Sequence, residues 1–248
     1  TDKILEEDGE NILQYSTTEG YLPLREYISE SYLKNSGIVV PPDEILITNG
    51  SQQGLDLIGK VFLNKGDCML MEEPGYLGAI QAFSMFEPEF ETVPMTHEGV
   101  DTAKLKEKIE KYNPKLFYAV PNFQNPSGIT YSHENRKKIA DFMKDSNTIF
   151  IEDDPYGELR FIGNKVPSMK KYMNDNVILL GSFSKIVSPG MRLGWIHAGR
   201  DIMEKLIIAK QGADLQSNYF SQRVVYEYLK ENNIEIHIEK ITGLYKKQ

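Results

Sequence analysis

Residues 181–195, GSFSKIVSPGMRLGW, place a lysine and an arginine directly after the apolar run NVILL. A lysine amine can attack a carbonyl carbon, and an arginine guanidinium can hold two oxygens of an anion at once. Both side chains are costly to bury without a partner. Lys185 and Arg192 therefore belong either to an ordinary surface turn or to a site that binds a ligand.

The segments that would carry these residues alternate between strands and helices. Short β-rich runs are expected at residues 44–48, 68–73, 89–95, 115–120, 148–154, 176–183 and 194–199. Helical spacing of apolar residues is found between them at residues 51–63, 76–86, 102–112 and 132–145, and after the last of them at residues 200–213 and 221–232. This alternation predicts an α/β fold of three layers, in which a mostly parallel central sheet is flanked by helices.

The composition excludes several classes of protein. A formal net charge of −8 argues against direct contact with nucleic acid, because phosphate contacts need clustered Lys and Arg. No apolar run approaches the length of a membrane span, and no signal segment opens the chain. The single cysteine, Cys68, excludes an internal disulfide and fits a reducing compartment, so we expect a cytoplasmic protein.

The carboxyl ends of the expected strands carry polar and aromatic residues. Ligands of such folds bind beyond these ends. The residues found there are a hydroxyl-and-amide helix start (49–52), an aromatic ring (Tyr76), an amide (Asn125), a carboxylate with a phenol (Asp153, Tyr156) and the lysine. We therefore expect the ligand at this edge of the sheet.

Three short motifs are rejected as guides to the ligand. GLDLIGK (54–60) has the spacing of a P-loop, but Val61 stands where a Ser or Thr would hold magnesium. SFSK (182–185) matches S-x-x-K, but the companion elements of serine-nucleophile enzymes are missing. EDD (152–154) could suggest a metal, yet the four histidines are scattered without ligand spacing, so no metal is expected.

A pyridine aldehyde that carries a phosphate would give each ring-facing residue a task. Lys185 would form a Schiff base with the aldehyde, which needs an amine that can be neutral; burial and a nearby arginine favour that form. Asp153 would keep the ring nitrogen protonated, so that the ring accepts electrons from a substrate carbanion. Tyr156 and Asn125 would donate to the ring oxygen, and Tyr76 would stack on the ring.

The phosphate of such a ligand would need hydrogen-bond donors. The backbone N–H groups of Gly50, Ser51 and Gln52 open a helix, whose dipole favours an anion. The hydroxyl of Ser182 and the guanidinium of Arg192 would add further donors.

Each of these residues also has a plainer explanation when it is taken alone. A lysine after a strand is commonly a solvated cap, aspartates before a proline are usual in turns, and Ser51 with Gln52 could cap a helix. A shared ligand is the explanation that accounts for all of them at one edge of the sheet.

Five separated motifs, in order, carry a resemblance to a known family. SFSKIVSPGMRLGW resembles the cofactor-lysine segment of fold-type I pyridoxal-phosphate (PLP) aminotransferases of class I/II. ITNGSQQGLDL, EEPGYLGAIQAF, PNFQNPSG and EDDPYGELRF resemble the other signature loops of one branch, which includes the bacterial 2-aminoadipate (LysN-type) and kynurenine aminotransferases. The resemblance runs from LQYSTTEGYLPLREYI to AKQGADLQSN, which is nearly the whole chain.

The resemblance implies roles for individual residues. It makes Lys185 the Schiff-base lysine, with Asp153 at the ring nitrogen and Tyr156 and Asn125 at the ring oxygen. It places further cofactor contacts at Gly50, Ser51, Gln52, Tyr76, Ser182, Ser184 and Arg192. It also implies that Tyr21 reaches the phosphate of the neighbouring subunit, and hence a homodimer with shared sites.

The resemblance also implies a domain organisation. Residues 1–40 are expected to form an N-terminal helical segment that contributes to the dimer interface and the active site, and residues 41–248 the PLP-binding large domain. Family members continue into a small domain whose arginine holds the substrate carboxylate. The chain opens at Thr1 and ends in the helix-like ITGLYKKQ, so we expect a piece of a longer protein that lacks this C-terminal domain.

The implied activity is amino-group transfer by a ping-pong mechanism. The expected partners are an amino acid (2-aminoadipate, aromatic or similar), a 2-oxo acid such as 2-oxoglutarate, and a second copy of the chain, without a membrane or direct nucleic-acid contact. Two alternatives would use the same residues. One is the PLP-binding effector domain of a MocR/GntR-type transcription regulator, behind a winged-helix DNA-binding domain; the other is lyase or decarboxylase chemistry on the same scaffold.

Overall fold

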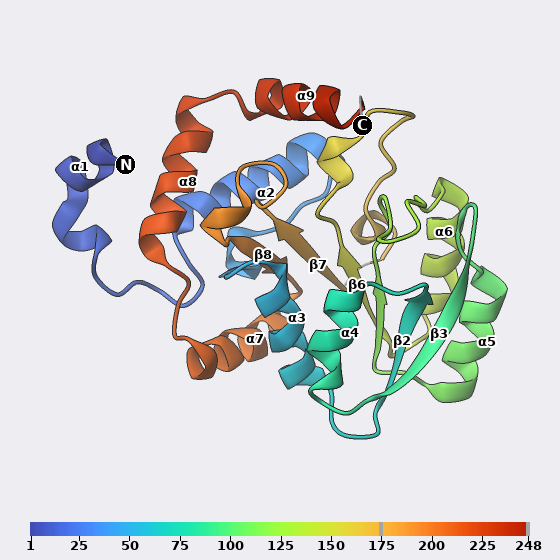
Figure 1. Cartoon of the computed structure of the whole chain (residues 1–248). Helices are drawn as coiled ribbons and strands as arrows, with labels where there is room; N and C mark the ends of the chain where they lie inside the picture. The colour runs from blue at the N-terminus through green and yellow to red at the C-terminus, as the bar shows by residue number, and fades with distance from the viewer. Residues whose placement is uncertain (174–175, 247–248) are drawn as a thin grey trace.

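The computed structural model describes residues 1–173 and 176–246, and within them one sheet carries the fold (Figure 1). The sheet has eight strands in the order β1-β8-β7-β6-β5-β2-β3-β4. Their bounds are Ile45–Thr48 (β1), Cys68–Glu73 (β2), Glu89–Thr96 (β3), Gly99–Val100 (β4), Leu116–Ala119 (β5), Ile149–Asp153 (β6), Val177–Ser182 (β7) and Gly194–His197 (β8).

The strand directions decide which residues share an edge. The neighbouring pairs among β7, β6, β5, β2 and β3 are parallel, whereas β8 runs antiparallel to both β7 and β1. Strand β8 therefore begins at the edge of the sheet where the parallel strands, β7 among them, end. This brings Arg192, two residues before β8, to the same edge as Ser182 at the end of β7.

Helices cover both faces of the sheet (Figure 1). One face is packed by α3 (Ser51–Phe62), α4 (Leu77–Ser84) and α7 (Arg200–Ala213). The other is packed by α2 (Leu22–Ser36), α5 (Thr102–Tyr112), α6 (His133–Met143) and α8 (Tyr219–Glu231). Two more helices lie further from the sheet. Helix α1 (Asp2–Ile12) lies beside α8, and α9 (Ile234–Tyr245) follows α8 near the end of the chain.

The alternation of side chains along each strand divides the core between these two faces. In β7, Val177 and Leu179 belong to the core cluster that contains the buried residues of α2 and α8, while Ile178 and Leu180 belong to the cluster that contains those of α3 and α7. All four side chains are buried, as expected for a strand that is covered on both sides. The continuous apolar run NVILL is therefore explained by burial on two faces.

The fold class expected from the sequence is confirmed. Each expected strand is present, with ends that differ from the expected bounds by no more than two residues, and the two-residue strand β4 is an addition. Within the segment 1–40, α2 packs Leu24 and Ile28 into the core of the sheet. The expected helical end of the chain is observed as α9, and its last two residues, 247 and 248, lie outside the described residues.

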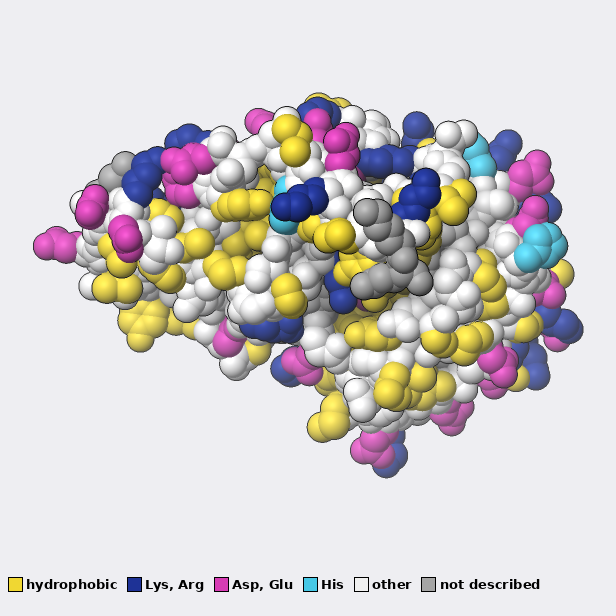
Figure 2. Space-filling model, turned by 45° about the horizontal axis from the view of Figure 1, so that its top comes forward, with side chains coloured by type: hydrophobic (Ala, Val, Ile, Leu, Met, Phe, Trp, Pro, Cys, Tyr) yellow, Lys and Arg dark blue, Asp and Glu magenta, His cyan; other side chains and the backbone are white. Residues whose placement is uncertain are grey.

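The surface in view mixes charges of both signs with hydrophobic side chains (Figure 2). Lys and Arg side chains lie among Asp and Glu on this face, in keeping with the mixed composition of the chain. Across the described ranges, we find no helix that combines the length and the apolar character needed to cross a bilayer.

Candidate active site

A cavity of about 260 Å³ lies at the edge where β5, β6 and β7 end. Ten of the residues expected from the sequence line it: Ser51, Gln52, Tyr76, Asn125, Asp153, Tyr156, Ser182, Ser184, Lys185 and Arg192. They come from five loops that are far apart in the sequence. The fold therefore brings together the residues that the motifs singled out.

Asp153 offers the cavity an oxygen without a partner. It is the last residue of β6 and is buried, and its Oδ2 accepts a hydrogen bond of 2.7 Å from the hydroxyl of Tyr118. Its Oδ1 is buried and unpaired. Burial raises the pKa of Asp153 to about 7, although the bond from Tyr118 lowers it. An N–H donor from a ligand would pair this oxygen and favour the ionised carboxylate.

Tyr118 is a residue of the cavity that the motifs did not indicate. It lies in β5, is fully buried, and faces the cavity beside Val120. Because side chains alternate along a strand, the pattern of KLFYAV puts Tyr118 and Val120 on one face and Phe117 on the other. That alternation could have indicated that the phenol of Tyr118 faces the same side of the sheet as Val120. Its hydrogen-bond partner on β6, Asp153, depends on the order of the strands.

Lys185 lies in the turn that follows β7. The hydroxyl of Ser182, a buried residue, accepts a hydrogen bond of 3.1 Å from the backbone N–H of Ser184, and this bond shapes the turn. The Nζ of Lys185 lies 5.7 Å from the centre of the Tyr156 ring. The burial of Lys185 that the sequence suggested is wrong for this chain, because the side chain is exposed. The turn follows the end of the strand, and its residues 184–188 are partly buried or exposed.

The start of α3 forms a cradle for an anion. Gly50 precedes the helix with a φ of 76°, and no side chain caps the N–H groups of the first turn. A Cβ atom at Gly50 would lie 2.8 Å from Nη2 of Arg192, and one at Gly194 would lie 2.9 Å from the backbone N of Ser51. Glycine at both positions lets the strand, the helix start and the guanidinium approach one another.

Gln52 contributes to the cradle through its backbone position. Its Nε2 donates a hydrogen bond of 2.8 Å to the carbonyl oxygen of Gly78 in α4, so the side chain is already engaged. This bond ties the first turns of α3 and α4 together. Tyr76, directly before α4, thereby lies at a fixed place beside the cradle.

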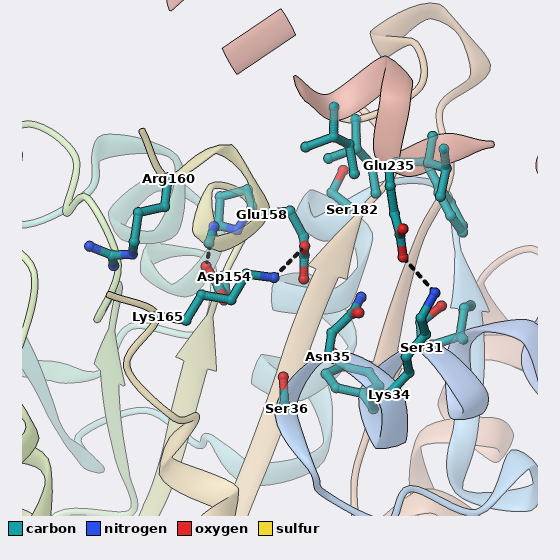
Figure 3. A pocket seen from close by; sticks show the side chains of 18 of the residues that line it. Ser31, Lys34, Asn35, Ser36, Asp154, Glu158, Arg160, Lys165, Ser182 and Glu235 are labelled. Atoms are coloured by element: carbon teal, nitrogen blue, oxygen red, sulfur yellow. Dashed lines mark hydrogen bonds and ion pairs between the residues drawn. The ribbon is translucent and has the colours of Figure 1, made fainter. Parts of the chain in front are cut away.

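Asp154, the neighbour of Asp153, belongs to a different site. It lines a groove of about 1410 Å³ between α2, α9 and the loop after β6 (Figure 3). Its carboxylate accepts hydrogen bonds from Nδ2 of Asn122 (2.9 Å) and from the backbone N–H of Gly157 (2.8 Å). Figure 3 shows the ion pair between Lys165 and Glu158 in the same groove.

Tyr21 is not part of the cavity of its own chain. Its ring contacts Tyr219 and Tyr226 edge to face, with centroid distances of 5.5 and 5.4 Å, and the guanidinium of Arg223 lies 5.0 Å from its centre. Gly50 likewise is not among the residues that line the cavity, although it borders Arg192. The expected contact of Tyr21 with a neighbouring subunit stays a prediction.

Comparison with known proteins gives the family. Residues 1–233 match the model of the family "Aminotransferase class I and II". The chain belongs to this family. It is 42% identical over 252 residues to aromatic-amino-acid aminotransferase 1 of Thermococcus litoralis, and 43% identical over 250 residues to the 2-aminoadipate transaminase of Thermus thermophilus. Each alignment covers 99% of this chain and 60–61% of the relative, so the chain spans about three-fifths of their length.

A solved structure extends this likeness to the fold. LysN, the α-aminoadipate aminotransferase of Thermus thermophilus, superposes with a TM-score of 0.93 at 42% identity, over 99% of this chain and 62% of that one. That structure contains N-(5′-phosphopyridoxyl)-L-leucine. A weaker relative is an uncharacterized HTH-type transcriptional regulator of Bacillus subtilis, 35% identical over 91% of this chain and 47% of its own length.

Proposed function

We propose that this chain is the cofactor-binding part of a PLP-dependent transaminase. The observation that carries the proposal is the buried, unpaired Oδ1 of Asp153, which faces a cavity that also contains the exposed lysine and an anion cradle. Family membership supports the same conclusion, because homologues of this class use pyridoxal phosphate. Residues 41–248 would form the large domain, and residues 1–40 would contribute to the dimer interface and the active site.

The residues present fit the cofactor. Asp153 would hold the proton of the ring nitrogen, since its free oxygen needs a donor. Tyr156 and Asn125 would donate to the ring oxygen, and Tyr76 would cover one ring face. The phosphate would be held by the first N–H groups of α3 and by four side chains at the same edge of the sheet: Ser51, Ser182, Ser184 and Arg192.

In the reaction, Lys185 has two tasks. It would hold the cofactor covalently through Nζ until the substrate amine displaces it. Free Nζ would then take the proton from the α-carbon of the substrate and later return one, as base and as acid. When bound, the cofactor supplies an electron sink for the charge left on that carbon.

The substrates follow from the relatives. We propose an amino acid of the 2-aminoadipate or aromatic class as the donor, because two relatives at 42–43% identity are named for these amino acids. As the acceptor we propose a 2-oxo acid such as 2-oxoglutarate, which the resemblance of the motifs implies. The protein would be cytoplasmic. It would act as a homodimer, in which Tyr21 of one subunit reaches the phosphate held by the other.

A regulator is the second candidate. The similarity to an HTH-type transcriptional regulator extends over 91% of this chain and 47% of that protein, and it supports a regulator in which this domain follows a DNA-binding domain. Identity to the two aminotransferases is higher, at 42–43% against 35%, and this difference favours the enzyme.

The test combines labelling with turnover in the full-length protein. Borohydride reduction of the cofactor-loaded protein, followed by peptide mapping, is expected to tag Lys185, and Lys185→Ala is expected to lose the tag. Lys171→Ala, which removes another lysine of the chain, is the matched control and should keep it. Amino transfer from 2-aminoadipate or an aromatic amino acid to 2-oxoglutarate supports the enzyme; a tag without any turnover supports the regulator. A tag on another lysine overturns the site.

A further inference from the structure

Gln124, the residue directly before Asn125, is held at every polar atom. Its side chain is 1% exposed. Its Nε2 donates to Oε2 of Glu72 (3.0 Å) and to the carbonyl oxygen of Pro74 (2.7 Å). Its Oε1 accepts from the backbone N–H (2.8 Å) and the hydroxyl (2.6 Å) of Ser127. Such complete pairing fixes the loop on both sides of Asn125.

Glu72 fixes Gln124 in turn. This carboxylate lies near the end of β2 and is 1% exposed. Its Oε1 accepts from the hydroxyl of Tyr131 (2.6 Å) and from the backbone N–H of Val120 (3.2 Å). Burial raises the pKa of Glu72 to about 7, and the hydrogen bonds from Tyr131, Gln124 and Val120 lower it. The carboxylate thus joins β2, the end of β5 and both ends of the Asn125 loop.

The two loops joined by this network carry two of the residues that face the cavity. Pro74 leads to Tyr76, and Gln124 leads to Asn125. Neither Glu72 nor Gln124 lines the cavity itself. A buried carboxylate and amide placed so close behind a ligand site can set the geometry of that site without touching the ligand.

We propose that Glu72 and Gln124 form a clamp that positions Asn125 against the ring oxygen of the cofactor and holds it in register with Tyr76. The proposal rests on the proposed function, since it gives Asn125 its ring-facing role. Glu72 and Gln124 are positioning residues. A purely structural network would affect stability alone, whereas this clamp must also affect the spectrum of the bound cofactor.

Glu72→Gln tests the clamp with little change of volume. The new amide places an NH₂ group against Nε2 of Gln124, or against the N–H of Val120 if it is turned, so two donors face each other in either orientation. Gln124→Met removes the side-chain hydrogen bonds at similar length. Asn125→Leu removes the proposed contact with the ring. Thr148→Val is the control, because it deletes the buried hydrogen bond from the hydroxyl of Thr148 to the carbonyl oxygen of Pro114. Thr148 directly precedes β6 and so lies at the opposite end of that strand from Asp153 and the cavity.

The measurement is a pH titration of the absorbance of the bound cofactor in the full-length protein. A donor to the ring oxygen favours its ionised form, so losing it should raise the midpoint by about one to two pH units, the size of one charge-assisted hydrogen bond. Asn125→Leu, Glu72→Gln and Gln124→Met are each expected to raise it, and Thr148→Val to leave it unchanged. The double variant Gln124→Met/Asn125→Leu should show no further rise over Asn125→Leu.

The outcomes separate the clamp from the proposed function. Unchanged midpoints in Glu72→Gln and Gln124→Met, with a raised midpoint in Asn125→Leu, overturn the clamp alone. A fully additive double variant also overturns it. No cofactor absorbance in the unmodified protein, or no effect of Asn125→Leu, overturns the ring-facing role of Asn125 and the clamp with it. If Gln124→Met does not fold, Glu72→Gln decides alone.

Discussion

Asp153 and Asp154 are neighbours in the sequence, yet their carboxylates line two different cavities of the fold. Asp153 faces the small cavity and pairs with Tyr118, while Asp154 faces the wide groove and pairs with Asn122 (Figure 3). Because successive residues at the end of a strand point to opposite faces, only one of the two can reach a ligand in the cavity.

Asp153→Asn is expected to slow proton removal from the substrate, whereas Asp154→Asn is expected to leave this step nearly unchanged. Asparagine keeps the shape of Asp153 but cannot hold the ring nitrogen protonated by charge. Breaking a buried ion pair costs about 3–5 kcal/mol, and a large share of this in the barrier lowers the rate by about two to three powers of ten. Single-turnover kinetics of both variants with a good amino donor is the measurement. The reverse order of rates would show that the ligand contacts Asp154.

The same Asp153→Asn substitution is expected to stabilise the cofactor-free protein at pH 8. The pKa of Asp153 is raised in the folded state from 3.8 to about 7, so its contribution to stability is present at low pH and is lost as the pH rises through 7. Removing the charge should raise the free energy of unfolding by about 1–3 kcal/mol at pH 8 and leave it unchanged near pH 4. Urea unfolding of the cofactor-free proteins at both pH values measures this. A loss of stability at pH 8 would contradict the raised pKa.

Tyr118→Phe is expected to weaken cofactor binding, although Tyr118 appears in none of the sequence motifs. The substitution removes the only hydrogen bond that the described residues give to the Asp153 carboxylate, and so raises its pKa further. A hydrogen bond to a charged group is worth about 1.5–3 kcal/mol, which corresponds to a loss of affinity of about tenfold or more. Cofactor titration measures it. Tyr32→Phe, which removes a phenol that accepts from Trp195, is the control and should bind normally.

Arg192→Lys is expected to weaken cofactor binding by about ten- to a hundredfold, because an ammonium is a point charge and cannot grip two phosphate oxygens. The guanidinium lies against Gly50 at the start of α3, where the phosphate is proposed to bind. Arg200→Lys, an exposed arginine beside Glu204 in α7, is the matched control. Equal affinity in the two variants would move Arg192 out of the phosphate site.

Local patterns in the sequence were sufficient to predict the helices and strands and most of the residues that line the cavity. Alternating strands and helices predicted the layered sheet, because apolar periodicity is a property of each segment alone. The ligand-facing residues could be predicted because they lie at strand ends, as Asp153 does, or just after them, as Lys185 does, and parallel strands bring their ends to one edge. The family assignment, made from the motifs of these same loops, is confirmed by the match over residues 1–233.

Tertiary structure alone decided the contacts between residues that are distant in the chain. The pairing of Tyr118 with Asp153 requires β5 and β6 to be neighbours, and the approach of Arg192 to Gly50 requires β8 to run antiparallel between β7 and β1. The bond from Gln124 to Glu72 spans 52 positions and depends on the same strand order. Such contacts form through the packing of whole elements, and no local spacing in the sequence encodes which elements will meet.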